Sequence, residues 1–576
     1  MEYDEEIDKY LTPLVIGVTG HRDLVPVEVD QLKSSVAGFI AELQQRFPNT
    51  PIQVMTALAE GADRLAAHVA LDAGTNVQAV LPMPAEIYKE DFDSSASKAD
   101  FEALCERCDV LALPISATEL DALEPSGPNR NLRYANAGMY ISSHCHILLA
   151  IWDGVQSDKA GGTSQIVYFQ HYDRLPGLAE NVPRSSLFLT DDESDLVYHI
   201  LCSRRKSSSS GDTGRTVQSS WFTSDRDSPR VESMPPRYIR VFEHHDTYNS
   251  DVVRQLRRNP QWRSTEADPP PTPMYDAAAR IRDFFDVADM LADHFQKRIN
   301  LTLACIYSLA FLTGLTFILY SELAGFDRLI YFFLASLLFG TLLAFVAQKR
   351  EWHRKYLDYR VLAEGLRVQF YRSIAGIFGE GYTKFAYDNF LRQRDMELGW
   401  IRNVMRVAGI LTDAQAPRTD EVGIHFTIDH WIGTELNVGQ LAYYRIKARQ
   451  RSRMNRFIDT ITLVCLWGGI VIACILAFFL HDRGDDVRDP LIILMGVLPL
   501  IAGIAEVYTQ RKADRELTKQ YQFMSRVFSN ARRRLDQASD NEERREILQG
   551  VGDAALSEHA EWILVHRVRA PEPAGF

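Results

Sequence analysis

Four long runs of apolar residues in the C-terminal half of the 576-residue chain limit its possible folds more than any other feature. Leu301–Tyr320, Leu329–Ala347 and Thr460–Leu480 contain no charged residue, and a shorter fourth run lies between Asp489 and Glu506. A helix needs about 20 apolar residues to cross a bilayer. One such run also fits a buried core helix, but four runs in two close pairs predict transmembrane helices. We place these helices at residues 301–320, 329–347, 460–480 and 490–508.

The charges beside these runs predict their orientation. Lys349, Arg350, Arg453 and Arg456 adjoin the ends that lead into long segments, whereas the two short connecting loops are rich in acidic residues. Lys and Arg accumulate on the cytoplasmic side of membrane proteins. We therefore expect a multi-pass protein of the bilayer, with both termini and every long segment in the cytoplasm.

The composition bears on the cellular compartment of the protein and on whether it binds metal or nucleic acid. The N-terminus is acidic and lacks the apolar run of a secretory signal, and the seven cysteines have no regular spacing, which favours reduced cytosolic thiols. Cys105 and Cys108 form a C-x-x-C pair, but zinc needs four converging ligands and this pair lies on an apparent helix, so we expect no metal. With a net charge of −13, we expect no direct binding of nucleic acid.

The N-terminal third has the pattern of a parallel α/β sheet. Short β-rich runs alternate with helical segments between Leu14 and Leu201, which predicts a Rossmann-like domain. The expected strands are Leu14–Thr19, Ile52–Ala57, Val77–Pro82, Val110–Pro114 and His146–Trp152, with Ser186–Thr190 as a sixth candidate. Pro26 and Pro48 bound an expected amphipathic helix over Val27–Phe47.

Compositional breaks predict the domain boundaries. Ser203–Pro236 is rich in serine and proline, and a proline-rich run begins at Asp268. We expect a nucleotide-binding domain at 1–202, a linker and connector at 203–273, a first transmembrane hairpin with cytosolic helices at 274–400, and a second at 401–576. The helices Glu351–Arg372 and Ala513–Leu535 are amphipathic, which fits either a cytosolic bundle or a location on the membrane surface.

Three glycine-containing loops follow predicted strands. They contain the candidate ligand-binding residues Thr19, Gly20, His21, Arg22, Glu60, Gly61, Asp63, Asp153, Gly154, Gly161, Gly162 and Thr163. Carboxyl ends of parallel strands share one edge of a sheet, where open α/β folds bind ligands. Glycines permit close backbone approach, His21 and Arg22 suit a phosphate, and Glu60 or Asp63 suits ribose hydroxyls. Asp63 equally fits a helix cap, and Tyr88 fits either base stacking or core packing.

These loops, together with Leu81-Pro82-Met83-Pro84 and Tyr88, resemble the SLOG superfamily of nucleotide-binding domains. The C-terminal half resembles the SLATT class of two-helix membrane effectors, here duplicated, on segments such as Leu366–Tyr371 and Trp562–Arg567. The resemblance implies a bacterial inner-membrane protein of anti-phage defence. Its domain would bind a nucleotide messenger, either a cyclic nucleotide or a derivative of NAD or ADP-ribose, and switch a pore-forming membrane module.

The same resemblance implies a homo-oligomer and a messenger-producing enzyme upstream. Lonely-guy phosphoribohydrolases of this superfamily carry P-G-G-x-G-T and a following glutamate, whereas this chain has Gly161-Gly162-Thr163-Ser164-Gln165 without that acid. We therefore expect no catalytic residue and binding without turnover. Because Glu60 offers a carboxylate, a membrane-tethered N-glycosidic hydrolase stays open, as does a ligand-gated channel of ordinary physiology.

Overall fold

The computed structural model forms two compact units. It describes residues 6–124, 127–157, 161–172, 175, 195–205, 217–225, 230–262, 276–323, 325–377, 387, 390–391, 396–413, 421–434, 439–479, 485–511 and 514–568. The first unit contains Met1–Val287 and Arg372–Asp420, and the second contains Ala288–Tyr371 and Glu421–Phe576. The chain therefore leaves the first unit, returns to it, and leaves it again.

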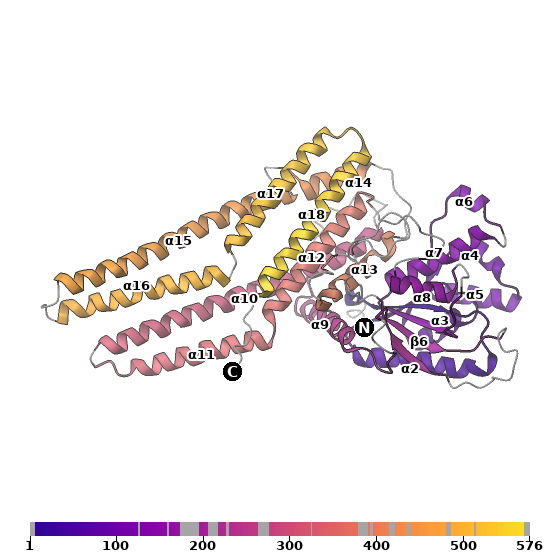
Figure 1. Cartoon of the computed structure of the whole chain (residues 1–576), viewed down its shortest axis with the longest axis horizontal. Helices are drawn as coiled ribbons and strands as arrows, with labels where there is room; N and C mark the ends of the chain where they lie inside the picture. The colour runs from indigo at the N-terminus through magenta and orange to yellow at the C-terminus, as the bar shows by residue number, and fades with distance from the viewer. Residues whose placement is uncertain are drawn as a thin grey trace. The chain divides into compact units, whose positions relative to one another are not determined.

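A seven-stranded sheet organises the first unit (Figure 1). The strands are β1 (Leu14–Gly20), β2 (Ile52–Thr56), β3 (Asn76–Leu81), β4 (Asp109–Ala112), β5 (Ile147–Trp152), β6 (Val197–Leu201) and β7 (Ser219–Phe222). Their order is β4-β3-β2-β1-β5-β6-β7, and only β7 is antiparallel to its neighbour. Apolar β1 and β5 are buried at the centre, as a parallel sheet covered on both faces requires. The predicted α/β fold class is thus confirmed.

The helices of the first unit connect and cover these strands. They are η1 (Pro26–Glu28), α2 (Val29–Arg46), α3 (Ala62–Asp72), α4 (Ala85–Tyr88), η2 (Lys89–Asp91), α5 (Ser95–Arg107), α6 (Ala117–Asp121), α7 (Pro128–His144), α8 (Thr163–Tyr172), α9 (Pro236–Arg258), η4 (Met396–Leu398) and α13 (Gly399–Asp413). The candidate strand Ser186–Thr190 lies outside the described residues. The last parallel strand that the structure describes is β6.

Two segments that the predicted boundaries placed outside the N-terminal domain belong to the first unit. Residues 203–273, expected as linker and connector, contain β7 at the sheet edge and α9, whose Asn249 side chain exchanges hydrogen bonds with the Thr12 backbone (3.1 and 2.9 Å). Helix α13, beyond the first hairpin in sequence, also belongs to this unit, since the Asn403 carbonyl lies 3.1 Å from His146 Nε2. The four-residue strand β7 has no clear sequence signal, because it lies in a serine-rich stretch. The position of α13 depends on its tertiary contacts, which the local sequence does not show.

The second unit is entirely helical in its described residues. Its helices are α10 (Asp276–Glu322, whose first turns belong to the first unit), α11 (Leu329–Lys349), α12 (Trp352–Ile374), α14 (Glu421–Thr427), the π-helix η5 (Ile428–Ile432), α15 (Gly439–Phe479), α16 (Asp485–Arg511), α17 (Asp514–Gln537) and α18 (Asn541–Val568). In Figure 1, α10 with α11 and α15 with α16 form two long hairpins.

Four of these helices, α10, α11, α15 and α16, are long and apolar enough to cross a membrane. Their apolar side chains are largely exposed: Leu338 is 72% and Phe478 is 78% accessible. Exposed apolar surface of this extent marks contact with lipid or another protein, so the four helices suggest a multi-pass membrane protein. Within the hairpins the packing is close. Thr313 Oγ1 lies 2.8 Å from Ser336 Oγ, and Gly469 faces Pro499.

The amphipathic helices α12 and α17 form part of a bundle with α15 and α18 rather than lying apart from it. A buried carboxylate, Glu364, holds part of this bundle together. It pairs with Arg360 at 2.6 Å, Arg367 at 2.7 Å and His559 of α18 at 3.4 Å. Burial alone would raise the pKa of Glu364, but the cations outweigh it and hold this pKa well below its usual range.

Replacement of Gly61, the residue before α3, by alanine tests the close packing at the centre of the sheet. Gly61 has φ +83°, and an added Cβ would lie 2.5 Å from the carbonyl oxygens of His21 and Arg22. Gly61→Ala should therefore destabilise the protein by about 2 kcal/mol or more. Gly38→Ala in α2, where a Cβ meets nothing within 4 Å, should instead stabilise it slightly. Thermal unfolding of the purified variants measures both changes in stability. Equal changes in the two variants would contradict the close packing described around Gly61.

Candidate nucleotide site

A cavity of about 290 Å³ lies in the first unit where the strand order reverses between β1 and β5. Ten of the fourteen predicted site residues line it: Thr19, Gly20, His21, Arg22, Asp63, Pro82, Tyr88, Gly161, Gly162 and Thr163. Glu60, Gly61, Asp153 and Gly154 lie beside the cavity without lining it. Its walls come from the carboxyl ends of β1, β2, β3 and β5. This is the position at which doubly wound sheets bind ligands.

Glycines bring the β1 and β2 loops into direct contact. The Ala62 amide donates to the His21 carbonyl at 3.0 Å, which fixes the first turn of α3 against the end of β1. A Cβ on Gly20 would lie 2.3 Å from that of Ala62. The requirement for Gly20 and Gly61 thus arises from packing between protein segments, and this packing forms one wall of the cavity.

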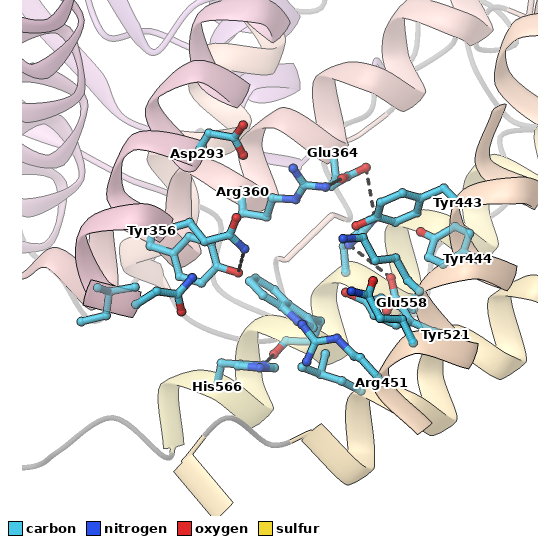
Figure 2. A pocket seen from close by; sticks show the side chains of 18 of the residues that line it. Asp293, Tyr356, Arg360, Glu364, Tyr443, Tyr444, Arg451, Tyr521, Glu558 and His566 are labelled. Carbon is cyan, nitrogen blue, oxygen red and sulfur yellow. Dashed lines mark hydrogen bonds and ion pairs between the residues drawn. The ribbon is translucent and has the colours of Figure 1, made fainter. Parts of the chain in front are cut away.

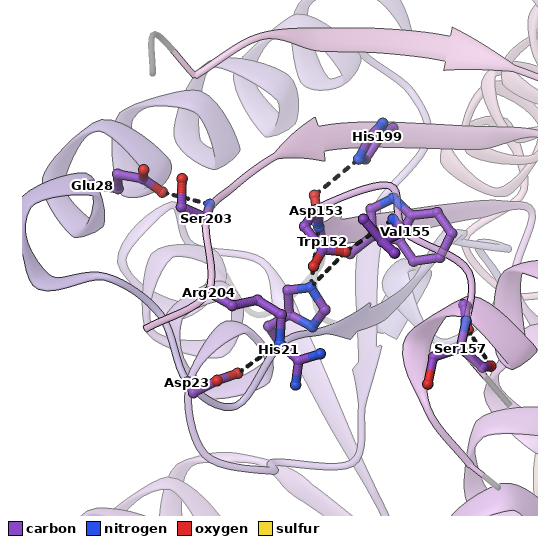
Figure 3. A network of polar contacts seen from close by, with 11 residues as sticks. His21, Asp23, Glu28, Trp152, Asp153, Val155, Ser157, His199, Ser203 and Arg204 are labelled. Atoms are coloured by element: carbon purple, nitrogen blue, oxygen red, sulfur yellow. Dashed lines mark hydrogen bonds and ion pairs between the residues drawn. The ribbon is translucent and has the colours of Figure 1, made fainter. Parts of the chain in front are cut away.

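His21 is held by the residues that follow β5 (Figure 3). The Asp153 amide donates to His21 Nε2 at 3.1 Å, and Asp153 Oδ1 lies 3.2 Å from the same nitrogen. Burial lowers the pKa of His21 and outweighs the opposing effect of Asp153. Near neutral pH the imidazole is therefore mainly neutral, so His21 contributes shape and hydrogen bonding rather than the positive charge expected from the sequence.

Two arginines supply positive charge at the cavity. The Arg22 guanidinium lies 5.1 Å from the ring centre of Tyr134, in a cation–π arrangement that leaves the side chain exposed. Arg204, which follows β6, also lines the cavity, and its Nε lies 3.3 Å from Asp23 Oδ1 (Figure 3). Arginine stays protonated and presents several donors, which suits phosphate or carboxylate oxygens.

Asp63 is a buried carboxyl in the same cavity. The Thr56 hydroxyl and the amides of Ala57 and Ala59 donate to it, so Asp63 ties down the loop after β2 instead of capping α3. Burial raises the pKa of Asp63 to about 7, although Arg22 and these donors act in the opposite direction. Near neutral pH this group is thus present in both protonation states.

The remaining predicted residues have mainly structural partners. Glu60 accepts a short hydrogen bond from Ser97 Oγ and does not reach the cavity. Tyr88 is buried and packs edge-on against Phe92 and Phe101, with ring centres 5.1 and 5.6 Å away. It reaches the cavity from this aromatic cluster, so core packing accounts for most of its contacts.

The third loop enters the cavity at the start of α8. Gly161 has φ +72°, and its amide donates to the Gln165 side chain at 3.1 Å. Ser164 Oγ donates to the Ser157 carbonyl at 2.9 Å, which closes the loop. The first turn of α8, with buried Thr163, lines the same cavity as the arginines and Asp63, and a helix N-terminus favours negative charge there.

Sequence reasoning missed Arg204 and the wall provided by α7. Asn131 and Tyr134 of α7 line the cavity, and Tyr134 is held by a short hydrogen bond to Asp91. The signal for Arg204 was its place just after β6, the sixth parallel strand, whose carboxyl end lies at the same edge of the sheet. No comparable local signal marks α7.

Chemically, the cavity combines two arginines, one of them paired with Asp23, with the Asp63 carboxyl, which titrates near neutrality, and a helix N-terminus. Among the residues that the structure describes, no cluster of His, Cys, Asp and Glu side chains is arranged to hold a metal ion. No family model matches this chain, and neither a curated protein nor a solved structure shows significant similarity to it.

The pKa of Asp63 predicts how stability depends on pH. Between about pH 4 and 7 the folded state retains a proton that the unfolded state has lost, so stability should fall as pH rises, by up to about 1.4 kcal/mol per pH unit. Asp63→Asn should flatten this dependence, because the amide does not titrate. Melting temperatures at pH 5.5 and 7.5 measure it, with Asp72→Asn, an exposed site on the same helix, as control. Equal behaviour of both variants would contradict the raised pKa.

Proposed function

We propose that the first unit binds a small phosphate-bearing ligand of the nucleotide type and thereby switches the membrane helices of the second unit. The cavity at the strand reversal carries this proposal, because Arg22 and Arg204 both line it, the latter beside its partner Asp23. An anion there is favoured by both guanidiniums and by the first turn of α8. At about 290 Å³ the cavity matches the lower end of small-molecule sites, so part of a nucleotide would extend past its mouth.

Individual parts of a nucleotide find matching groups around the cavity. Phosphate oxygens suit Arg22 and the α8 turn, whereas a ribose hydroxyl suits the Asp63 carboxyl, which accepts a hydrogen bond when ionised. The Tyr134 ring, with Arg22 over one face, also lines the cavity and offers an aromatic surface to a base. A cyclic nucleotide and a derivative of NAD or ADP-ribose both carry these parts.

The resemblance to SLOG sensors and SLATT effectors extends the proposal to the whole chain. We infer a sensor–effector of a bacterial inner membrane, with both termini cytoplasmic, that acts as a homo-oligomer downstream of a messenger-producing enzyme in anti-phage defence. The combination of a Rossmann-like sheet and four apolar helices in one chain supports this reading. Membrane permeabilisation would be the output.

Ligand binding can drive such a switch only through a difference in affinity between two states. To convert a 1:99 population into 99:1, the ligand must favour one state by about 5.5 kcal/mol. Contacts made by both arginines in one state and by one arginine in the other would supply part of this difference. Helices α10 and α12 each contribute residues to both units and are therefore continuous covalent routes between them.

An N-glycosidic hydrolase is the alternative that the site keeps open. Such a reaction needs a carboxyl group near the anomeric carbon, and Asp63 has a pKa suited to a general acid. Its carboxylate, however, already accepts hydrogen bonds from three donors in its own loop, and Glu60 is engaged by Ser97. Binding without turnover therefore accounts better for the arrangement.

Calorimetry of the full-length protein in detergent with ADP-ribose, NAD⁺ and cyclic AMP tests ligand binding. If one of them binds, Arg22→Gln should weaken it about tenfold or more, since a charge-assisted hydrogen bond is lost. Arg107→Gln on α5, where the side chain is half exposed and away from the cavity, should leave affinity unchanged. Unchanged affinity in Arg22→Gln removes that residue from the site, and release of free base during titration would indicate the hydrolase.

Dye leakage from proteoliposomes tests the membrane output. A ligand that binds in calorimetry should increase leakage from vesicles containing the wild-type protein, and Arg22→Gln should require more ligand for the same effect. Vesicles without protein provide the background. If a bound ligand never changes leakage, membrane permeabilisation is excluded as the output, whereas ligand binding by the first unit is not.

A further inference from the structure

The second unit contains a polar chamber of about 800 Å³ that the proposed nucleotide site does not use. We call it the chamber; its lining includes Asp289, Arg360, Glu364, Lys447, Arg451 and Glu558. Figure 2 shows side chains of α10, α12, α15, α17 and α18 turned toward this common space. The chamber lies where α10, α15 and α16 pass into their apolar segments, since it also contacts Asn300, Met454 and Tyr508.

The charges of the chamber are unevenly distributed. At the α12 side, Glu364 pairs with Arg360 and Arg367, and Arg360 also lies 2.8 Å from Asp289, so these charges largely compensate one another. At the α15 side, six of the twelve residues in Arg445–Arg456 are Lys or Arg and none is acidic. Lys447 and Arg451 of this segment line the chamber. Asp293 of α10 also lines the chamber, so the excess of positive charge is confined to the α15 side.

Tyrosine rings lie beside both the lysine and the arginine. Lys447 Nζ is 5.8 Å from the centre of Tyr443, and the Arg451 guanidinium is 5.5 Å from that of Tyr521. Glu558, the acid on the α18 side, already has a basic neighbour, since its Oε2 lies 3.2 Å from His559 Nδ1. An anionic group entering the chamber would thus meet an environment that favours it.

An apolar groove of about 460 Å³ adjoins the chamber at Tyr508. We call it the groove; Phe311, Ile458, Ile461, Ile501, Ile504 and Tyr508 line it. Tyr508 lines both spaces and packs edge-on against Tyr307, with ring centres 5.5 Å apart. Along α15, Lys447, Arg451, Asn455, Ile458 and Ile461 follow a spacing of three or four residues, so one helix face changes from cationic to apolar.

We propose that the chamber and the groove together bind a phospholipid with an anionic headgroup. Lys447 and Arg451 contact the headgroup phosphate, and one acyl chain occupies the groove between α10, α15 and α16. A cationic space joined to an apolar one matches an amphiphile, whereas a free phosphate leaves the groove without an apolar occupant. Four helices apolar enough to span a membrane place lipid beside this site. This inference concerns the second unit and does not rest on nucleotide binding by the first.

Native mass spectrometry of the full-length protein in detergent tests the headgroup contact, with phosphatidylglycerol and phosphatidylcholine of identical acyl chains as probes. Wild type should bind phosphatidylglycerol more tightly. The double variant Lys447→Gln, Arg451→Gln should weaken phosphatidylglycerol binding about tenfold or more and leave phosphatidylcholine little changed. Glycerol 3-phosphate should compete only weakly, because it lacks the acyl chain.

The matched control is Arg449→Gln, Arg453→Gln. It removes two positive charges from the same segment of α15, but these arginines line a different hollow between α15 and α17. Lipid preference should remain close to that of wild type. If both double variants lose phosphatidylglycerol equally, the attraction is a general property of the basic segment and the proposed site is wrong.

A second pair of variants tests the groove. Ala505 of α16 lines the groove, so Ala505→Phe should fill it and weaken both lipids several-fold. Val507→Phe lies on the same helix at an exposed position outside the groove and should have little effect. Full binding by Ala505→Phe, or competition by glycerol 3-phosphate at the affinity of the lipid, would overturn the proposal.

Discussion

The reversal of strand order between β1 and β5 is the constraint on which the first unit depends. From β1 the chain builds outward through β2, β3 and β4, and then crosses back to place β5 on the other side of β1. The chain that follows β1 therefore leads toward β2, whereas the chain that follows β5 leads toward β6, and a crevice remains between the two paths beyond the His21–Asp153 contact. Because parallel pairing aligns Gly20 with Ile151, both loops start at the same level of the sheet.

Electrostatics then decides what this crevice can accept. Burial keeps His21 mainly neutral and leaves Asp63 able to take up a proton, so permanent charge comes from Arg22 and Arg204. The two arginines come from loops more than 180 residues apart in sequence. Arg22 lies over the Tyr134 ring, and Arg204 pairs with the Asp23 carboxylate, so only one of the two positive charges has an acidic partner among these contacts. Glu364 in the second unit differs, because Arg360 and Arg367 compensate its charge within a buried network.

Local sequence signals predicted much of this molecule. Uncharged runs such as Leu329–Ala347 identify the membrane-type helices, and β-rich segments identify β1 to β5. The signal is clear for β1 and β5, because burial on both faces demands continuous apolar residues. The candidate loops were found because they follow those strands. What escaped prediction depends on tertiary contacts: β7 lies in a serine-rich stretch, α13 returns to the first unit, and Arg204 becomes a cavity residue only once β6 has joined the sheet.

Helix α10 has a mechanical consequence. Its 47 residues correspond to a rod of about 70 Å, and it contains no proline. Its one glycine, Gly314, lies deep in the apolar half, where Leu500 packs against it. A helix without proline has few positions at which it can kink. A rotation of the first turns of α10 about the helix axis would therefore be passed on to its far end.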